Sequence, residues 1–261
     1  MFNVGNLVTR NSYDNDTLFK ITSIKGNIAI LKGVEVRLIV DSQLNDLKIY
    51  DVEIKNKETL ERDEEIDIND FLPSDRSTYF YIPGKILHID GDTEYLNRCL
   101  KFYKKSNVSA TGLCMKETDL EENIIKELET HKPDILVITG HDFLYKFSNS
   151  GDISNYKNSL NFVKGVRQAR NYERSQDKLI IIAGACQSDY EELIKNGANF
   201  ASSPKRVNIH ALDPAIIACL VSLSEKNEDI DLIGIINKTK YKDKGIGGIK
   251  TRGTMYVGYP K

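Results

Sequence analysis

Asp134-Ile-Leu-Val-Ile-Thr-Gly140 and Lys178-Leu-Ile-Ile-Ile-Ala-Gly-Ala185 are the two stretches that decide the fold of this chain. Each is a run of branched aliphatic residues followed by small ones. Continuous aliphatic runs of this length predict strands that are buried on both faces, as in parallel sheets flanked by helices. In such sheets, the catalytic and ligand-binding residues lie just beyond the carboxyl ends of the strands.

Strand-like and helix-like segments alternate along the chain on both sides of these two runs. Repeated alternation of this kind predicts an α/β domain with three layers and a mostly parallel sheet. We expect strands at 85–90, 108–115, 134–139, 178–183, 199–203 and 232–236, and helices at 94–105, 120–130, 156–172, 190–196 and 214–224.

The first 55 residues have a different pattern, with short β-branched stretches at 6–10, 18–23, 28–32 and 36–40 separated by turn-forming residues. Strands of this length and spacing predict a small SH3-like antiparallel β-barrel. We therefore divide the chain into this barrel at 1–55, a charged linker at 56–78, the α/β domain at 79–240 and a glycine-rich C-terminal segment at 241–261. That last segment fits a loop, an edge hairpin or a mobile flap.

The composition excludes several classes of function. Charged residues make up 28% of the 261 residues and the formal net charge is −2, so nucleic acid is not an expected partner. We find neither a signal pattern nor an apolar stretch long enough for a membrane span, and we expect a cytoplasmic protein. The four cysteines lack C-x-x-C spacing and the histidines lack metal-ligand spacing, so we expect no metal and no cofactor.

The residues that follow the two aliphatic runs are His141 and Cys186, 45 positions apart. If the two strands are neighbours, both side chains emerge at one edge of the sheet. A thiol beside an imidazole is a nucleophile beside its base. This pair predicts a catalytic dyad and makes 79–240 the expected catalytic domain.

Two local features favour a thiolate at Cys186. The first is His141, which can take the thiol proton and hold an ion pair with the sulfur. The second is the helix that follows Cys186. Ser188 with Glu191 fits a capping box, so the positive end of a helix is expected close to the sulfur. Gly184 and Ala185 leave room for a peptide to approach. Main-chain N–H groups of Gly140, Asp142 and Cys186 are candidates for holding the developing oxyanion.

Other interpretations stay open at this point. Both residues are also explained as ordinary strand-end residues without a catalytic role. A non-peptidase hydrolase of the α/β type also places a cysteine after a strand, but it normally has glycine where this chain has Ser188. A third interpretation is a non-catalytic scaffold protein that binds its partners through the N-terminal barrel. His88 is expected to be a packed core histidine, whereas His210 could reach the active edge.

The strand-end histidine and the Ala-Cys pair resemble the caspase and clostripain type of cysteine peptidase, although here the glycine precedes His141. Longer blocks resemble the YabG family of sporulation-specific proteases. These blocks are Ile89-Asp-Gly-Asp92, Pro133-Asp-Ile-Leu-Val-Ile-Thr-Gly-His-Asp142, Ala183-Gly-Ala-Cys-Gln-Ser188, Gly197-Ala-Asn-Phe-Ala-Ser-Ser-Pro204 and Ile209-His-Ala-Leu-Asp-Pro214.

The resemblance implies a cysteine endopeptidase that processes spore coat and germination precursor proteins in the mother cell, with association to the spore coat. It implies Cys186 as nucleophile, His141 as base and cleavage after arginine. A guanidinium needs a carboxylate partner in its pocket. The candidates at the active edge are Asp90, which we favour because it ends a central strand, Asp92, Asp142 and Asp189. The oligomeric state does not follow from the sequence.

Overall fold

The computed structural model describes residues 2–50, 66–68, 80–145 and 151–258. Its contacts divide the chain into two compact units, Met1–Ile66 and Asp67–Lys261. Most of the expected charged linker at 56–78 lies outside the described residues.

The first unit contains a five-stranded antiparallel sheet in the order β4-β3-β2-β1-β5. Phe19 and Ile21 are buried and Lys20 and Thr22 are exposed, so one face of β2 packs inward while the other faces solvent. Its end strands β4 and β5 do not pair with each other among the described residues, so the antiparallel sheet is confirmed and a closed SH3-like barrel is not. The strands are β1 Leu7–Arg10, β2 Phe19–Lys25, β3 Ile28–Gly33, β4 Ile39–Gln43 and β5 Leu47–Ile49, with 3₁₀ turns η1 Asn11–Tyr13 and η2 Leu44–Asp46.

The second unit is built around a six-stranded sheet in the order β12-β11-β10-β9-β7-β8. All neighbouring pairs are parallel except β11 with the edge strand β12, which is antiparallel. The expected α/β class with a mostly parallel sheet is therefore confirmed. The strands are β7 Ile86–Asp90, β8 Ala110–Cys114, β9 Ile135–Thr139, β10 Ile180–Ala183, β11 Phe200–Ser202 and β12 Ile246–Gly248, and a separate ribbon pairs β6 Phe80–Ile82 with β13 Tyr256–Gly258.

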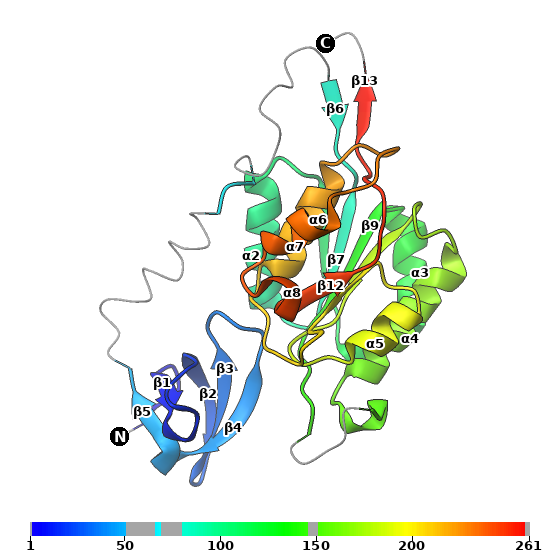
Figure 1. Cartoon of the computed structure of the whole chain (residues 1–261). Coiled ribbons are helices and arrows are strands. Elements are labelled where there is room, and N and C mark those ends of the chain that lie inside the picture. Colours follow the sequence, from blue (N-terminus) through cyan, green and yellow to red (C-terminus); the bar gives the residue numbers. More distant parts are fainter. Residues whose placement is uncertain (1, 51–65, 69–79, 146–150, 259–261) are drawn as a thin grey trace. The chain divides into compact units, whose positions relative to one another are not determined.

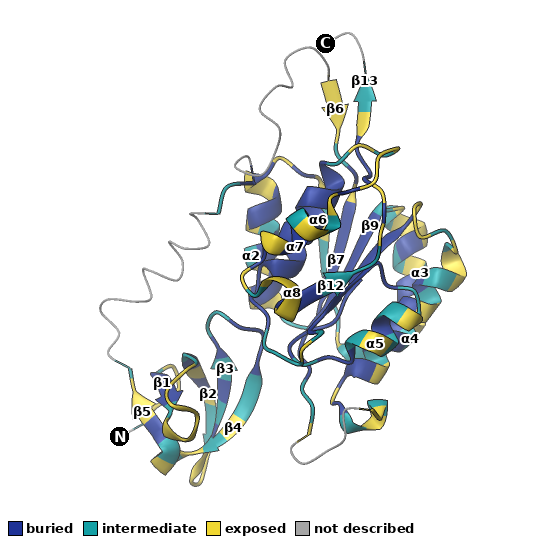
Figure 2. Ribbon diagram, in the orientation of Figure 1, coloured by how far each residue is buried: buried dark blue, intermediate teal, exposed yellow. Residues whose placement is uncertain are grey.

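Helices lie on both faces of this sheet (Figure 1). One face carries α3, α4 and α5, and the other carries α2 and α6 with α7 and α8 beside them. Burial colouring shows the four central strands β11, β10, β9 and β7 as buried, whereas the edge strands are partly exposed (Figure 2). The helices are α2 Thr93–Lys105, α3 Leu120–His131, α4 Ser159–Tyr172, α5 Tyr190–Lys195, α6 Asp213–Ser222, α7 Leu232–Asn237 and α8 Lys242–Gly245, with 3₁₀ turns η4 Glu117–Asp119 and η5 Ile153–Asn155.

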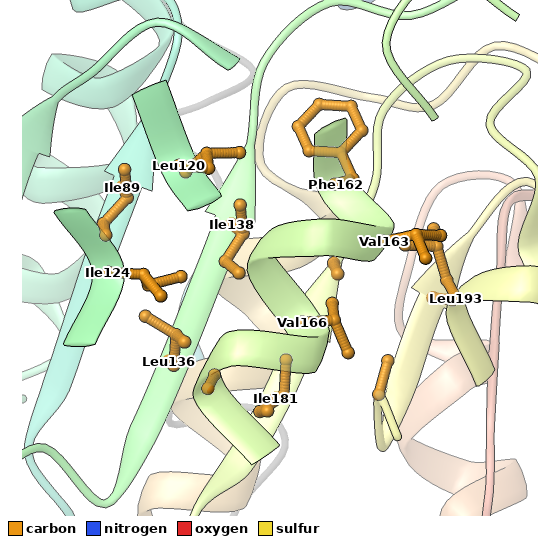
Figure 3. Close-up of a cluster of buried hydrophobic side chains, with 14 of the residues drawn as sticks. Ile89, Leu120, Ile124, Leu136, Ile138, Phe162, Val163, Val166, Ile181 and Leu193 are labelled. Carbon is orange, nitrogen blue, oxygen red and sulfur yellow. The ribbon is translucent and has the colours of Figure 1, made fainter. Parts of the chain in front are cut away.

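The core on the α3–α4–α5 face joins these helices to the central strands (Figure 3). Ile138 of β9 and Ile181 of β10 pack with Val166 and Phe162 of α4, and all four side chains are 0% exposed. Full burial of a side chain of this size stabilises the fold by about 1.5–3 kcal/mol. This packing holds the central strands, and hence their carboxyl ends, in one rigid frame.

Strand register brings three strand ends to one edge of the sheet. Ile138 of β9 pairs with Ile89 of β7 on one side and with Ala183 of β10 on the other. Asp90 then lies level with Thr139. The residues that follow β7, β9 and β10 therefore leave the sheet side by side.

The C-terminal part of the chain differs from the expectation at one segment. The run Leu232–Ile236, expected as a strand, lies in the helix α7 instead, because Asp231 caps it by accepting a hydrogen bond from Gly234 N. The glycine-rich segment contributes α8 and the edge strand β12, which pairs antiparallel with β11. In the described part of the chain, we find no helix that is both long and apolar enough to span a membrane.

Candidate active site

His141 follows β9 and lies close to the start of α2. Its Nε2 is 3.1 Å from Asp92 Oδ2, and the ring of Tyr95 approaches its ring edge-on with centroids 5.7 Å apart. Within the described residues, its Nδ1 is buried and has no hydrogen-bond partner. The carboxylate accepts from Nε2, so the hydrogen is placed there and Nδ1 is left with its lone pair.

The main chain of His141 is also held on both sides. Its N–H donates to Glu117 Oε1 at 2.8 Å, and its carbonyl accepts from Asn158 Nδ2 at 2.7 Å. A Cβ on Gly140 would overlap the Glu117 carboxylate, which explains the glycine before the histidine. The sequence interpretation missed Glu117, because its only signal is the pair of glycines, Gly91 and Gly140, that make room for it.

Cys186 follows β10 and is fully buried. Ile209 N donates to its Sγ at 3.3 Å. The next residue, Gln187, donates from its main chain to Val207 O and to Ser203 Oγ, both at 3.1 Å. The chain from Ser203 to Ile209, which we call the covering segment, therefore lies directly against the nucleophile candidate.

The two candidate loops are in direct contact. His141 and Cys186 each lie three positions beyond the paired residues Ile138 and Ala183. Ser188 Oγ donates to Asp142 Oδ2 at 2.9 Å, which joins the residue after His141 to the loop of Cys186. The expectation that the two strands are neighbours is confirmed, since β9 and β10 pair in parallel.

Asp142 is the centre of a buried hydrogen-bond network. Its Oδ1 accepts from Phe143 N at 2.9 Å and Asn158 N at 2.7 Å, and its Oδ2 accepts from Ser159 Oγ as well as from Ser188. Burial raises the pKa of Asp142, although these hydrogen bonds act in the opposite direction. Its contacts make it the tie between the two loops.

Asp90 and Asp92 lie at the end of β7 but have different surroundings. Asp90 is 0% exposed; its Oδ2 accepts from Thr139 Oγ1 at 2.8 Å and its Oδ1 accepts from Asp92 N at 2.9 Å. Asp92 caps α2 and contacts His141. His88 lies below them as expected for a core histidine, fully buried and hydrogen-bonded to Thr139.

Asp189 is the N-cap of α5, where its side chain accepts from Glu192 N at 3.3 Å. The expected capping box of Ser188 with Glu191 is therefore wrong, because Ser188 turns inward and accepts from Ala185 N at 2.9 Å. Arg206 Nη2 lies 3.6 Å from Asp189 Oδ1 and also contacts Glu191. Burial raises the pKa of Asp189, and Arg206 partly offsets this.

The backbone around Cys186 is unusual. Gly184 has φ +104°, and three residues with side chains also have positive φ: Gln187 (58°), Ser203 (69°) and Arg206 (54°). Such conformations cost free energy in residues other than glycine, and they concentrate at functional sites. The main-chain N–H groups of Gly140, Asp142 and Cys186 belong to these two loops.

The remaining candidates differ in their surroundings. His210 is in the connection next to Ile209, 7% exposed, and its Nδ1 accepts from Leu212 N at 3.3 Å. Burial raises the pKa of Cys219 to about 12, so this thiol stays protonated. Cys114 is exposed and Cys99 is buried. No group of three or more His, Cys, Asp or Glu side chains in the described ranges is placed to hold a metal ion.

Comparison with known proteins identifies the family of this chain. The model of the family described as YabG peptidase U57 matches residues 3–260. The sporulation-specific protease YabG of Bacillus subtilis (strain 168) is 42% identical to this chain, over 99% of this chain and 98% of that protein. Both matches extend over the sheet edge that carries His141 and Cys186. The chain therefore belongs to the YabG peptidase family and is a protease.

Proposed function

We propose that this protease is a cysteine endopeptidase with His141 as base and Cys186 as nucleophile. The observation that carries the proposal is that both residues directly follow neighbouring parallel strands, each three positions beyond the paired Ile138 and Ala183. The Asp142–Ser188 hydrogen bond supports it, because it joins the two loops. No metal or organic cofactor enters the proposed reaction.

The reaction proceeds in two halves. His141 Nδ1 takes the thiol proton, and the thiolate of Cys186 attacks the carbonyl carbon of the scissile peptide bond. The imidazolium then gives this proton to the departing amine, which leaves an acyl-enzyme. Water then attacks the thioester with His141 again as base. The carboxylate product is released, and the thiol of Cys186 is restored.

Oxyanion stabilisation is assigned to the main chain. Cys186 N–H, with Gly140 or Asp142 N–H from the other loop, would donate to the negative oxygen of the tetrahedral intermediate. The N–H of His141 between them is engaged by Glu117. The full burial of Cys186 requires the covering segment Ser203–Ile209 to move before a peptide reaches the sulfur.

Cleavage after arginine is part of the proposal. Among the four candidate carboxylates, Asp90 is fully buried, Asp142 is saturated by four donors and Asp92 contacts His141. Asp189 already has the Arg206 guanidinium beside it. We therefore assign Asp189, rather than Asp90, to the arginine of the substrate, which would replace Arg206.

The substrates we propose are spore coat and germination precursor proteins, processed in the mother cell of a sporulating bacterium. The support is the similarity to the Bacillus subtilis protease YabG, which is sporulation-specific. A protease needs no nucleic-acid or membrane partner for this role.

The decisive test uses purified Cys186→Ala and His141→Ala proteins with a protein substrate. Both should keep the wild-type unfolding transition, and both should lose cleavage by about 10³-fold or more. Cys114→Ser is the matched control, since this exposed cysteine belongs to neither the His141 loop nor the Cys186 loop, and it should cleave normally. Normal cleavage by Cys186→Ala would reject cysteine catalysis.

The selectivity is tested with peptides that differ only in having Arg, Lys or Leu before the scissile bond. The wild-type enzyme should prefer Arg. Asp189→Asn should lose most of that preference by an increase in KM, because the amide no longer pairs with the guanidinium. An unchanged Arg preference in this variant would show that another carboxylate binds the arginine.

A further inference from the structure

Three contacts with described residues hold the carboxylate of Asp92. Oδ2 lies 3.1 Å from His141 Nε2, and Oδ1 accepts from Glu94 N at 2.9 Å and Tyr95 N at 3.3 Å as the N-cap of α2. One oxygen therefore anchors the residue to a helix while the other faces the imidazole. A carboxylate held in this way has little freedom to turn away from the ring.

The main chain of Asp92 is fixed as well. Asp92 N donates to Asp90 Oδ1 at 2.9 Å, and Asp90 Oδ2 accepts from Thr139 Oγ1 at 2.8 Å. Thr139 is the last residue of β9, two positions before His141. This buried network fixes the positions of Asp92 and His141 relative to the same two strands, β7 and β9.

The ion pair lies in a poorly solvated place. The His141 side chain is 11% exposed and that of Asp92 is 14% exposed. A buried pair is screened much less than a surface pair, so the carboxylate stabilises positive charge on the ring more strongly than an exposed one would. Glu117, another charged group near the loop, contacts the His141 main chain.

The state of Nδ1 points to a proton transfer. This atom is buried and is not hydrogen-bonded to any part of the chain that the structure describes. An unsatisfied buried acceptor costs about 1–3 kcal/mol, so its retention is best explained by a use. With Nε2–H committed to Asp92, Nδ1 is the nitrogen that is able to receive a proton.

We propose that Asp92 is the positioning residue of the protease site: it holds His141 in the Nε2–H tautomer, so that Nδ1 acts as the base, and it stabilises the imidazolium that forms. This inference rests on the proposed role of His141. In this role Asp92 acts on the base His141 and does not bind the arginine of the substrate.

Asp92→Asn separates this role from the helix cap, because Asn caps helices about as well as Asp does. The variant should unfold as the wild type does. Its kcat should fall by about 10²- to 10⁴-fold with little change in KM. Asp231→Asn, the same substitution at the N-cap of α7, is the matched control and should leave kcat unchanged.

Three outcomes would overturn the proposal. The first is a kcat for Asp92→Asn equal to that of Asp231→Asn. The second is an increase in KM alone, which would return Asp92 to substrate binding. The third is a loss of folding in Asp92→Asn that the activity loss follows in proportion.

A second measurement does not depend on activity. The chain has four histidines, so ¹⁵N-histidine spectra with His141→Gln as the assignment control identify the His141 nitrogens. In wild-type protein Nε2 should carry the hydrogen, and the tautomer distribution should change in Asp92→Asn. An Nδ1–H tautomer in the wild type would refute the inference. If Cys186→Ala still cleaves while the spectra behave as expected, the proposed chemistry fails and the positioning contact stands.

Discussion

The two loops of the candidate site leave adjacent strands at the same level, yet they are held by different means. The ring of His141 is held by side chains that come from the start of α2, Asp92 and Tyr95. The sulfur of Cys186 lies against the main chain of Ile209. The His141 side chain keeps a small exposure of 11%, whereas Cys186 is fully buried.

Because the two loops are held differently, the rate of the chemical step and the access of reagents to the Cys186 sulfur should respond to different substitutions. Changing a charged partner of the His141 loop should alter the reaction rate without affecting how reagents reach the site. Changing the contacts of the covering segment Ser203–Ile209 should alter how often the sulfur is reachable. Asp142 and Ser188 join the two loops. A change at either residue should therefore affect both the reaction rate and the access to the sulfur.

The largest effect is expected from Asp142→Ala, which removes the tie between the loops. Four donors lose their acceptor, including the main-chain N–H groups of Phe143 and Asn158. We expect the free energy of unfolding in urea to fall by about 3 kcal/mol or more. Asp231→Ala, which removes only a helix cap, should cost about 1 kcal/mol. Equal losses in the two variants would mean that the network does not join the loops energetically.

A smaller effect is expected from Arg206→Gln, which should open the Cys186 loop without changing the chemistry of His141. Arg206 donates to Tyr156 Oη at 2.7 Å and to Glu191, and its side chain is 22% exposed. Such a partly exposed ion pair contributes about 1 kcal/mol, so alkylation of Cys186 by iodoacetamide should become about fivefold faster.

Alkylation is measured in a Cys114→Ser background, because Cys114 is exposed and would react as well. Lys195→Gln is the matched control. It removes the ion pair of Lys195 with Glu192, which lies in α5, the helix that also carries the Arg206 partner Glu191. Slower alkylation of Arg206→Gln would show that the guanidinium activates the thiolate more than it holds the covering segment closed.

The smallest effect concerns pH. Burial raises the pKa of Asp142 above its ordinary value of 3.8. The folded protein therefore binds this proton more tightly than the unfolded chain, and the resulting stabilisation is complete below about pH 3.8 and is lost as the pH rises through the folded-state pKa. Against Asp142→Asn, the wild type should gain relative stability as the pH is lowered from 7 to 4. A gain towards neutral pH would mean that the hydrogen bonds outweigh burial.

Sequence alone was sufficient for the central part of the fold. The aliphatic runs before His141 and Cys186 form buried parallel strands, as predicted, because few other structures bury such a run on both faces. Leu232–Ile236 looks equally strand-like but forms a helix, because the Asp231 cap and packing outweigh the β-propensity of its isoleucines. Closure of a barrel depends on pairing between strands far apart in sequence, and no local signal reports it.

The candidate site was predictable only in part. Cys186 and His141 follow recognisable strands, so their placement could be inferred. The contact of Asp92 with His141 spans 49 positions and depends on β7 lying next to β9, which the sequence does not reveal. Glu117 reaches the same loop from beyond β8, and Asp189 replaced Ser188 as the cap of α5 because Ser188 is drawn towards Asp142.

The burial of Cys186 has a consequence for oxidative damage. Peroxide converts an accessible thiolate to sulfenic acid and then to irreversible acids, and a thiol enclosed by main chain is shielded from it. In the resting protein the exposed Cys114 should therefore be oxidised first. Cys186 becomes vulnerable only while the covering segment is displaced, so turnover itself sets how long the protease survives in an oxidising medium.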